Sequence, residues 1–440
     1  MSDQKDKRIK KLEEELRKSK DNYEKLRKEF EKYKAVHVLT VSNLRKALKI
    51  KVNSDKKHAP LGAPKGHRGY ARKIPERIDY VKELRLRNCP RCNTLLGNVQ
   101  EIRTRHVTDI QLISIPRTTK YKIPRKYCPN CKKIVEPEVP NALPHAQFGL
   151  NLMLLVMYLK LGLRLPCNKI RDYFITMYNL PISEGEVIKI LRQLEVAFGG
   201  HYKSLENAVK IARVKHSDTT SWRINGKNYF AWVFIAYGVV LYKIHKRNNH
   251  KVALKFLGKQ KGNVLCVDRF SAYRTLAEKA GFKLQLCWSH ITENSKQLSE
   301  NFGKEAKNVH TKLKQIYSLA NGLNHKGNDE MVEQLKAEIF QLTKKHYTHS
   351  TIRKFVNNLY HRDADNLFRF VTDPEIDPTN NISERELRAL VIIRKISNGS
   401  RSKKGAKTTA TLLSIIQTLR LNNQNVLQGM HNILKPTSEQ

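Results

Sequence analysis

The segment from Arg213 to His290 constrains the fold more than any other part of this 440-residue chain. Three strand-like runs follow one another over 213–224, 228–238 and 239–246. The first two are joined by Asn225-Gly226, a dipeptide typical of a tight β-hairpin. We therefore expect three successive antiparallel strands, followed by a helix over 250–257.

The chain then returns to the sheet twice. The run NVLCVDRF predicts a short buried strand ending at Asp268, AYRTLAEKAG predicts a helix closed by Gly281, and KLQLCWSH predicts a fifth strand. Three antiparallel strands followed by alternating helices and strands is the order of an α/β ribonuclease H-like domain. In such a sheet Asp218, on the first strand, and Asp268, at the end of the fourth, would be neighbours.

The charge of the chain indicates a polyanionic partner. Lys and Arg number 83 against 40 Asp and Glu, which gives a formal net charge of +43 and a pI near 10.0. Nucleic acid is the favoured partner, with a ribosome-like or membrane-surface protein as the alternative. The most apolar run, 150–159, is too short to span a bilayer, and the charged N-terminus resembles no export signal. We expect a soluble, intracellular protein.

Within this cationic chain, three acids are candidates for a metal site: Asp218, Asp268 and Glu384. Mg²⁺ takes oxygen ligands, so converging carboxylates and a substrate phosphate could complete its shell. Two such ions can activate an attacking oxygen and stabilise a leaving oxygen at phosphorus. The pattern is that of a metal-dependent nuclease acting on DNA.

Residues 1–48 are expected to form a coiled-coil helix. Apolar side chains recur at alternating spacings of three and four, and charges fill the remaining positions. The seam positions are Ile9, Leu12, Leu16, Ser19, Tyr23, Leu26, Phe30 and Tyr33. We favour self-association into a homo-oligomer, although one amphipathic helix docked on its own domain would give the same pattern.

Residues 49–80 form a basic segment rich in Lys, His, Gly and Pro that cannot fold alone. It is either a solvated linker or a basic arm that lies along DNA phosphates or in a minor groove. In the second reading Lys65, Arg68 and Arg72 are DNA-binding candidates.

Residues 81–140 carry the strongest local motif, two C-x2-C pairs formed by Cys89, Cys92, Cys128 and Cys131. Such paired knuckles hold one structural Zn²⁺ tetrahedrally. Alternating apolar residues between them suggest strands, so we predict a zinc ribbon. The remaining cysteines, Cys167, Cys266 and Cys287, lack ligand spacing, and two of them are expected in the core.

Residues 145–212 are predicted to be helical. Ser183 and Glu186 form a capping box, and a break at 179–181 separates this helix from one over 167–178. The pair could be a DNA-binding helix-turn-helix or an ordinary helical linker, and the sequence does not decide between them.

Glu384 has two interpretations. Asn381 lies three residues before it, so Glu384 could complete a second capping box and have no catalytic role. Its helix also carries basic residues that suit DNA phosphates, namely Arg385, Arg388, Arg394 and Lys395. Glu386 competes with Glu384, but it lies roughly 200° further round the helix, so only one of the two can face the aspartates.

The strings HSDTTSWRINGKNYFAWVF, VLCVDRFSAY followed by LCWSH, and TNNISERELRALVIIRK resemble the DDE transposases of the insertion-sequence-sixty-six family. The N-terminal helix, basic arm and paired knuckles are similar too. The resemblance implies catalytic and metal-ligand roles for Asp218, Asp268 and Glu384, and a helical insertion at about 295–375. Cys287 and His290 match a C-x2-H signature shared by several transposase families, with core packing as the alternative.

We therefore expect residues 213–435 to be a ribonuclease H-like catalytic domain. Its two Mg²⁺ or Mn²⁺ ions would support cleavage at the ends of an insertion sequence and joining to target DNA. The alternatives are a structure-specific nuclease of the same fold and a catalytically decayed zinc-ribbon regulator. DNA and accessory transposition proteins are the expected partners, and the expected location is the cytoplasm, on the nucleoid. Cys287 and His290 would then support the metal ligands.

Overall fold

The computed structural model describes residues 139–434 continuously. Before them it describes 116–122, 126–128, 130 and 132–135, and five helical, exposed residues of the N-terminal segment: Glu14, Arg17, Asp21, Asn22 and Glu24. The chain divides into two compact units, residues 1–109 and 110–440, and the fold below is that of the second. The predicted coiled-coil seam, the basic arm and most of the zinc ribbon lie outside the described residues.

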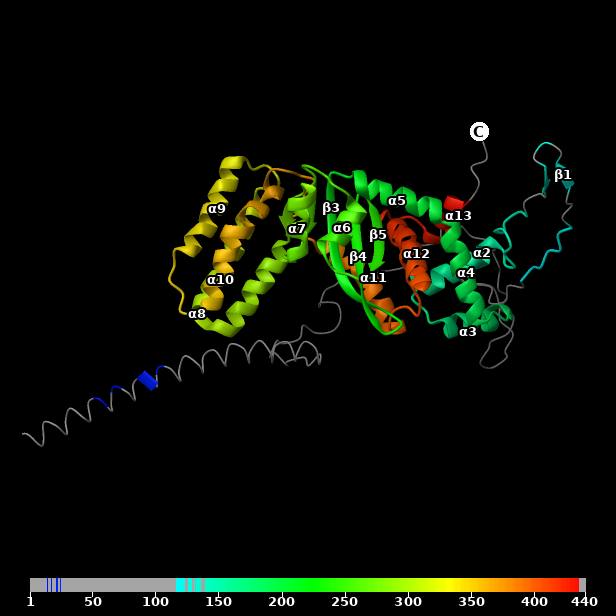
Figure 1. Ribbon diagram of the computed structural model, residues 1–440, viewed down its shortest axis with the longest axis horizontal. Helices are drawn as coiled ribbons and strands as arrows, with labels where there is room; N and C mark the ends of the chain where they lie inside the picture. Colours follow the sequence, from blue (N-terminus) through cyan, green and yellow to red (C-terminus); the bar gives the residue numbers. More distant parts are fainter. Residues whose placement is uncertain are drawn as a thin grey trace, which may run out of the picture. The chain divides into compact units, whose positions relative to one another are not determined.

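A five-stranded mixed sheet forms the centre of the second unit (Figure 1). Its order is β5-β4-β3-β6-β7, with the strands at Val239–His245, Lys227–Ala236, Val214–Ile224, Val264–Val267 and Lys283–Leu286. β3, β4 and β5 are antiparallel neighbours, whereas β3, β6 and β7 run parallel. All five predicted strands are present, and the first and fourth are adjacent, as the ribonuclease H-like order requires.

Local signals explain how these strands are connected. Asn225 and Gly226, with φ of 48° and 74°, make the two-residue turn between β3 and β4, and both values are positive as a type I′ turn demands. The predicted helix α6 spans His250–Leu257. Helix α7, at Ser271–Ala280, ends at Gly281 with a left-handed φ of 81°, a conformation that glycine adopts without a Cβ penalty.

The free edge of β5 is covered by helix α12, Lys403–Leu421. The backbone N–H groups of Val240 and Tyr242 donate to Thr418 Oγ1 at 3.0 Å and Ser414 Oγ at 2.9 Å. These hydroxyls satisfy edge groups that would otherwise be open to pairing with another chain. Helix α11, Asn381–Ser397, packs beside β3 and β4.

A helical region precedes the sheet and comprises α2 (Leu150–Met157), the π-helix η1 (Tyr158–Gly162), α3 (Cys167–Tyr178), α4 (Glu184–Ala197) and α5 (Gly199–Ile211). The predicted capping box is present: Glu186 N donates to Ser183 Oγ at 3.2 Å, and Ser183 N donates to Glu186 Oε2 at 2.7 Å. The predicted break between α3 and α4 is also confirmed. No helix in the described part of the chain is long and apolar enough to cross a membrane.

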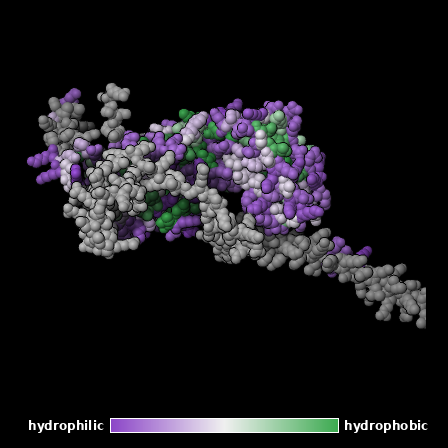
Figure 2. Space-filling model, turned by 180° about the vertical axis from the view of Figure 1, so that it is seen from behind, coloured by the Kyte–Doolittle hydropathy of each residue, from purple (hydrophilic) through white to green (hydrophobic). Residues whose placement is uncertain are grey.

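The other end of the sheet carries the largely helical stretch between β7 and α11 (Figure 1). It comprises α8 (Trp288–Gly322), α9 (Asp329–Thr343), α10 (Ser350–Asn358) and the short turns η2 (Leu359–Asp363), η3 (Ala364–Asn366) and η4 (Arg369–Val371). α8 starts directly after β7 and is kinked at Phe302 and Gly303. Most of the surface over these helices is hydrophilic in Figure 2.

Two smaller elements complete the described fold. α13, Val426–Leu434, follows α12. β1 (Lys126–Cys128) and β2 (Lys133–Val135) form an antiparallel hairpin in which Cys128 pairs with Lys133. Cys128 is the last residue of β1, and the other three predicted zinc ligands lie outside the described residues. Cys266 and Cys287 are buried, as expected for two of the remaining cysteines.

Candidate active site

Asp218 and Asp268 meet because their strands are paired. β3 and β6 run parallel, with His216 of β3 opposite Cys266 of β6. Asp218 lies two residues after His216, and Asp268 lies two residues after Cys266. Burial raises the pKa of Asp218 to about 7. The N–H of Thr219, 2.6 Å from Asp218 Oδ1, opposes this rise, whereas the negative charges of Asp268 and Glu384 add to it. The charges of the two other acids therefore both act on Asp218.

Asp268 lies on a loop fixed at both ends. Its Oδ1 accepts a hydrogen bond from the N–H of Phe270 at 3.0 Å. The next residue, Arg269, makes an ion pair at 2.6 Å with Asp363, a fully buried acid of the helical stretch that Arg274 also contacts. The helical stretch therefore helps to fix the loop that carries the second aspartate.

Glu384 lies in the first turn of α11, and the capping box that we predicted with Asn381 is absent. The helix begins at Asn381, and the preceding Asn380 makes no side-chain cap. Asn381 instead accepts a hydrogen bond from Ser289 Oγ at 3.2 Å. The capping interpretation of Glu384 is thus wrong, because the residue assigned as the cap is already helical.

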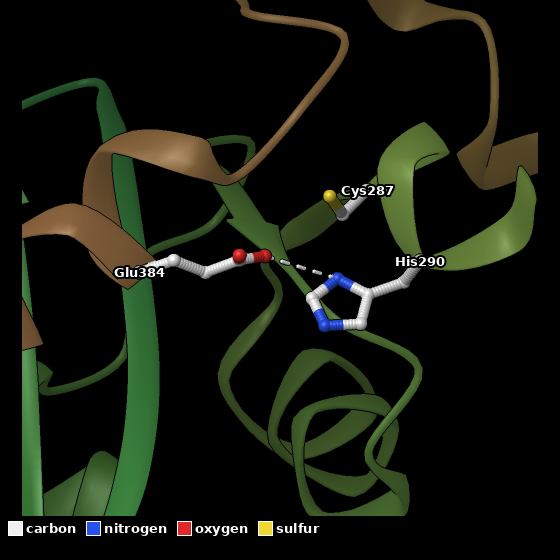
Figure 3. A group of neighbouring side chains, drawn as sticks. All are labelled: Cys287, His290 and Glu384. Carbon is white, nitrogen blue, oxygen red and sulfur yellow. Dashed lines mark ion pairs between the residues drawn. The ribbon is translucent and has the colours of Figure 1, made fainter. Parts of the chain in front are cut away.

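Glu384 points toward His290, as Figure 3 shows, and its Oε1 lies 3.4 Å from His290 Nδ1. The pKa of His290 is raised to about 9, chiefly by a hydrogen bond with the Cys287 thiol, against the effect of burial. Glu384 and Asp268 raise it further. The raised pKa favours the protonated imidazolium of His290 beside Glu384 at neutral pH.

Cys287 lies at the end of β7, as the N-terminal cap of α8. Its burial would raise its pKa, but hydrogen bonds from His290 and from the N–H of Asn380 hold it below its usual value. Ligand atoms of Cys287, His290 and Glu384 all lie within 4.8 Å of one another, and among the described residues this is the one such cluster. Asp218 and Asp268 are not part of it. Cys287 is a core residue, whereas the His290 side chain is 39% exposed and faces the site.

The carboxylates suit a hard divalent cation. Asp218, Asp268 and Glu384 offer oxygen ligands, and their mutual repulsion would be relieved by positive charge. The thiol and imidazole beside Glu384 are softer donors that suit transition metals. The donor set of the three acids therefore fits Mg²⁺ or Mn²⁺, as the sequence predicts.

Asn380 links the elements that hold these groups, and the sequence analysis missed it. It is fully buried. Its Nδ2 donates to the carbonyl of Ser217 at 2.8 Å, its Oδ1 lies 3.1 Å from His216 Nδ1, and its N–H donates to Cys287 Sγ at 3.1 Å. β3, the start of α8 and the start of α11 are thus joined by one side chain and its backbone. The Asn-Asn pair before Glu384 was the available signal, and we interpreted its second member as a cap.

Replacing Asn380 with alanine should lower the free energy of unfolding by about 1–3 kcal/mol, because buried polar partners lose their hydrogen bonds. Asn381→Ala is the matched control, and we expect it to cost less than about 0.5 kcal/mol, since this exposed residue makes one surface contact. Denaturant unfolding of both variants measures the difference. Equal losses would contradict the role assigned to Asn380.

The predicted DNA-binding residues of α11 do not share one environment. Arg385 and Arg388 are exposed, as is Lys395. Arg394 is half-buried and donates to the carbonyl and hydroxyl of Ser221 on β3, with Thr220 Oγ1 at 3.4 Å. Its guanidinium is therefore already engaged by the sheet. Lys65, Arg68 and Arg72 lie outside the described residues.

Comparisons with known proteins give two similar sequences and several similar solved structures. Two uncharacterized proteins of Sinorhizobium fredii, y4qI and y4jD, are 28% and 25% identical over 191 residues, or 39% of this chain. The match spans only 35% and 37% of their lengths. One solved structure is the integrase catalytic core of HTLV-2 in complex with magnesium, which is 12% identical over 24% of this chain and 86% of that chain. Another is an intasome of simian T-cell lymphotropic virus, which is 14% identical over 33% of this chain and 63% of that chain. Both superimpose with a TM-score of 0.15.

A family model matches far more of the chain. The model described as transposase IS66 family covers residues 145–408. This range starts before α2, includes the whole sheet and the three acids, and ends within α12. The chain therefore belongs to the transposase IS66 family.

Proposed function

We propose that this protein is a DNA transposase that cleaves phosphodiester bonds at the ends of an insertion sequence and joins the released 3′-hydroxyl to target DNA. The observation that supports the proposal is the pairing of β3 with β6, which places Asp218 and Asp268 at matching positions beyond neighbouring strands, with the charges of Asp268 and Glu384 both raising the pKa of Asp218. Family membership and the strongly basic composition support DNA as the substrate.

Two Mg²⁺ or Mn²⁺ ions held by the acids would supply activation of the attacking oxygen and stabilisation of the leaving oxygen. Asp218, with its pKa near 7, is only partly ionised at neutral pH, so its burial favours uptake of a cation that stabilises the carboxylate. His290 Nδ1 lies 3.4 Å from Glu384 Oε1 and would hold this carboxylate in place. Asn380 holds the three supporting elements in register.

The test is a strand-joining assay. The full chain is incubated with Mg²⁺ and a duplex that carries the inverted repeats flanking its gene, and the products are separated on denaturing gels. The expected result is cleavage that releases a 3′-hydroxyl, followed by its covalent joining to a second DNA. Cutting without joining would favour a nuclease of the same fold. DNA binding with no Mg²⁺-dependent cleavage would favour a catalytically decayed regulator.

We further propose that Cys89, Cys92, Cys128 and Cys131 hold one structural zinc ion. The hairpin at the second pair supports this, since β1 ends at Cys128 and β2 starts two residues beyond Cys131. Such hairpins present paired cysteines in zinc ribbons. We also propose that the N-terminal helix mediates self-association and that the basic arm contacts DNA phosphates.

Replacing Cys89 or Cys128 with serine should release one equivalent of zinc and unfold the 81–140 region, because binding energy in such modules is folding energy. Metal analysis of the purified protein and limited proteolysis measure the two effects. Cys167→Ser is the control, since Cys167 is half-exposed and lies outside the motif. Wild-type protein that contains no zinc would contradict the assignment.

A further inference from the structure

A cavity of about 520 Å³ beside α11 is lined by four arginines from three separate segments. Arg164 follows η1, Arg385 and Arg388 lie on α11, and Arg420 lies near the end of α12. Glu386 is the one acid in its lining. We refer to it as the arginine cavity.

The single carboxylate does not neutralise the cavity. Glu386 is 6% exposed and accepts hydrogen bonds from Gln417 Nε2 at 2.9 Å and from Arg385 Nε at 3.2 Å. Gln417 in turn accepts from Arg420 Nη1 at 3.1 Å, while Arg420 Nη2 donates to the carbonyl of Gly162 at 3.0 Å. This network fixes Arg420 in place and leaves an excess of positive charge in the cavity.

The two other arginines have unused donors. Among the described residues, Arg388 makes no side-chain hydrogen bond or ion pair, and Arg164 Nε is shielded from solvent without a hydrogen-bond partner. Arg164 also has a φ of 66°, a left-handed conformation that is unfavourable for any residue with a Cβ. Arg164 directly follows Leu163, the C-cap of η1, where a left-handed residue commonly ends a helix, so the free guanidinium donors, and not the backbone, are what favours a ligand.

The cavity lies next to the candidate active site along α11. Successive helical residues are about 100° apart, so Arg388 and Arg385 are about 40° and 100° round the helix from Glu384. The cavity therefore opens on the face of α11 adjacent to the one that carries the third acid. A DNA strand that reached the acids could place its neighbouring phosphates there.

We propose that the arginine cavity binds phosphodiester groups of the DNA strand that enters the active site. This inference rests on the proposed function and adds a subsite to it. The ligand chemistry is a phosphate ester, because guanidinium groups recognise phosphate by paired hydrogen bonds. The cavity would position the strand and would not take part in the chemical step.

The test compares full-length variants by fluorescence anisotropy with a random-sequence duplex at about 50–200 mM salt. The double variant Arg164→Gly/Arg388→Gln should lower the slope of log K against log salt by about 0.9 for each arginine. Arg353→Gln/Lys354→Gln is the matched control, because it removes two charges from exposed positions of α10 and should leave the slope almost unchanged. The melting temperature should not fall in Arg164→Gly, since glycine accepts the left-handed backbone.

Three outcomes separate the possible failures. A slope equal to that of wild type, or equal losses in the double variant and its control, would overturn the inference and leave the proposed function intact. Binding of inorganic pyrophosphate to the same variants is a second measurement. If the double variant lost pyrophosphate binding while its DNA slope stayed unchanged, the cavity would be a site for free phosphates, and the inference would be overturned. Wild-type protein that bound no DNA would overturn the proposed function and this inference together.

Discussion

Replacing Asp218 with asparagine is expected to abolish strand cleavage and joining while making the protein more stable in the absence of divalent cations. A lost cation ligand removes several kcal/mol of transition-state stabilisation, which corresponds to at least about 10³-fold in rate. DNA affinity should stay equal or rise, because a negative charge leaves a basic surface. Asp268→Asn should give the same loss of activity.

The gain in stability depends on pH. Burial raises the pKa of Asp218 from an ordinary value of 3.8 to about 7. A raised carboxyl pKa means that the folded state holds the proton of Asp218 more tightly than the unfolded state does. The protonated side chain therefore contributes stability that is complete below about pH 4 and is lost as the pH rises to 7. Asparagine has no such loss. Its advantage over aspartate should therefore grow between about pH 4 and 7, up to about 4 kcal/mol.

Thermal unfolding in EDTA across this pH range measures the effect, and a second series in Mg²⁺ provides the link to the proposed function. Mg²⁺ should stabilise wild-type protein by mass action and should have little effect on Asp218→Asn. Asp365→Asn is the control, since Asp365 is an exposed acid distant in sequence that pairs with Lys336. Full activity in Asp218→Asn, or equal stabilisation of both proteins by Mg²⁺, would contradict the assignment of Asp218 as a metal ligand.

The sheet could be predicted because its signals are local. The Asn225-Gly226 turn, the closing Gly281 and the Ser183–Glu186 capping box each act within four residues, and each is present in the structure. Strand order then follows from the sequence of elements. That order was sufficient to bring Asp218 next to Asp268, although the two are separated by fifty residues in the chain.

The supporting groups could not be predicted, because their partners are distant in sequence. Asn380 hydrogen-bonds Ser217, and this contact draws its side chain away from capping α11. A local rule for helix starts therefore misplaced the cap by one residue. Arg164 and Arg420 lie more than two hundred residues apart and meet only when η1 packs on α12. No periodicity within either segment encodes such a contact.

Glu384→Gln and Glu386→Gln provide the sharpest comparison between a functional and a structural acid, since the two lie in the same turn of α11. The Glu384 side chain is 44% exposed and faces His290, while Glu386 is buried and receives hydrogen bonds from Gln417 and Arg385. The two side chains therefore occupy different environments: Glu384 faces His290, and Glu386 belongs to the lining of the arginine cavity.

Glu384→Gln should reduce the rate of strand joining by at least about 10³-fold with little change in stability, because glutamine fills the same exposed volume but loses the charge that binds a cation. Glu386→Gln should retain activity and lose about 1–3 kcal/mol of stability, since hydrogen bonds to a buried carboxylate are weakened when it becomes neutral. Strand-joining rates in Mg²⁺ and denaturant unfolding separate the two effects. If Glu384→Gln joined strands as fast as wild type, Asp218 and Asp268 would lack a third ligand on α11, and the decayed-regulator alternative would gain support.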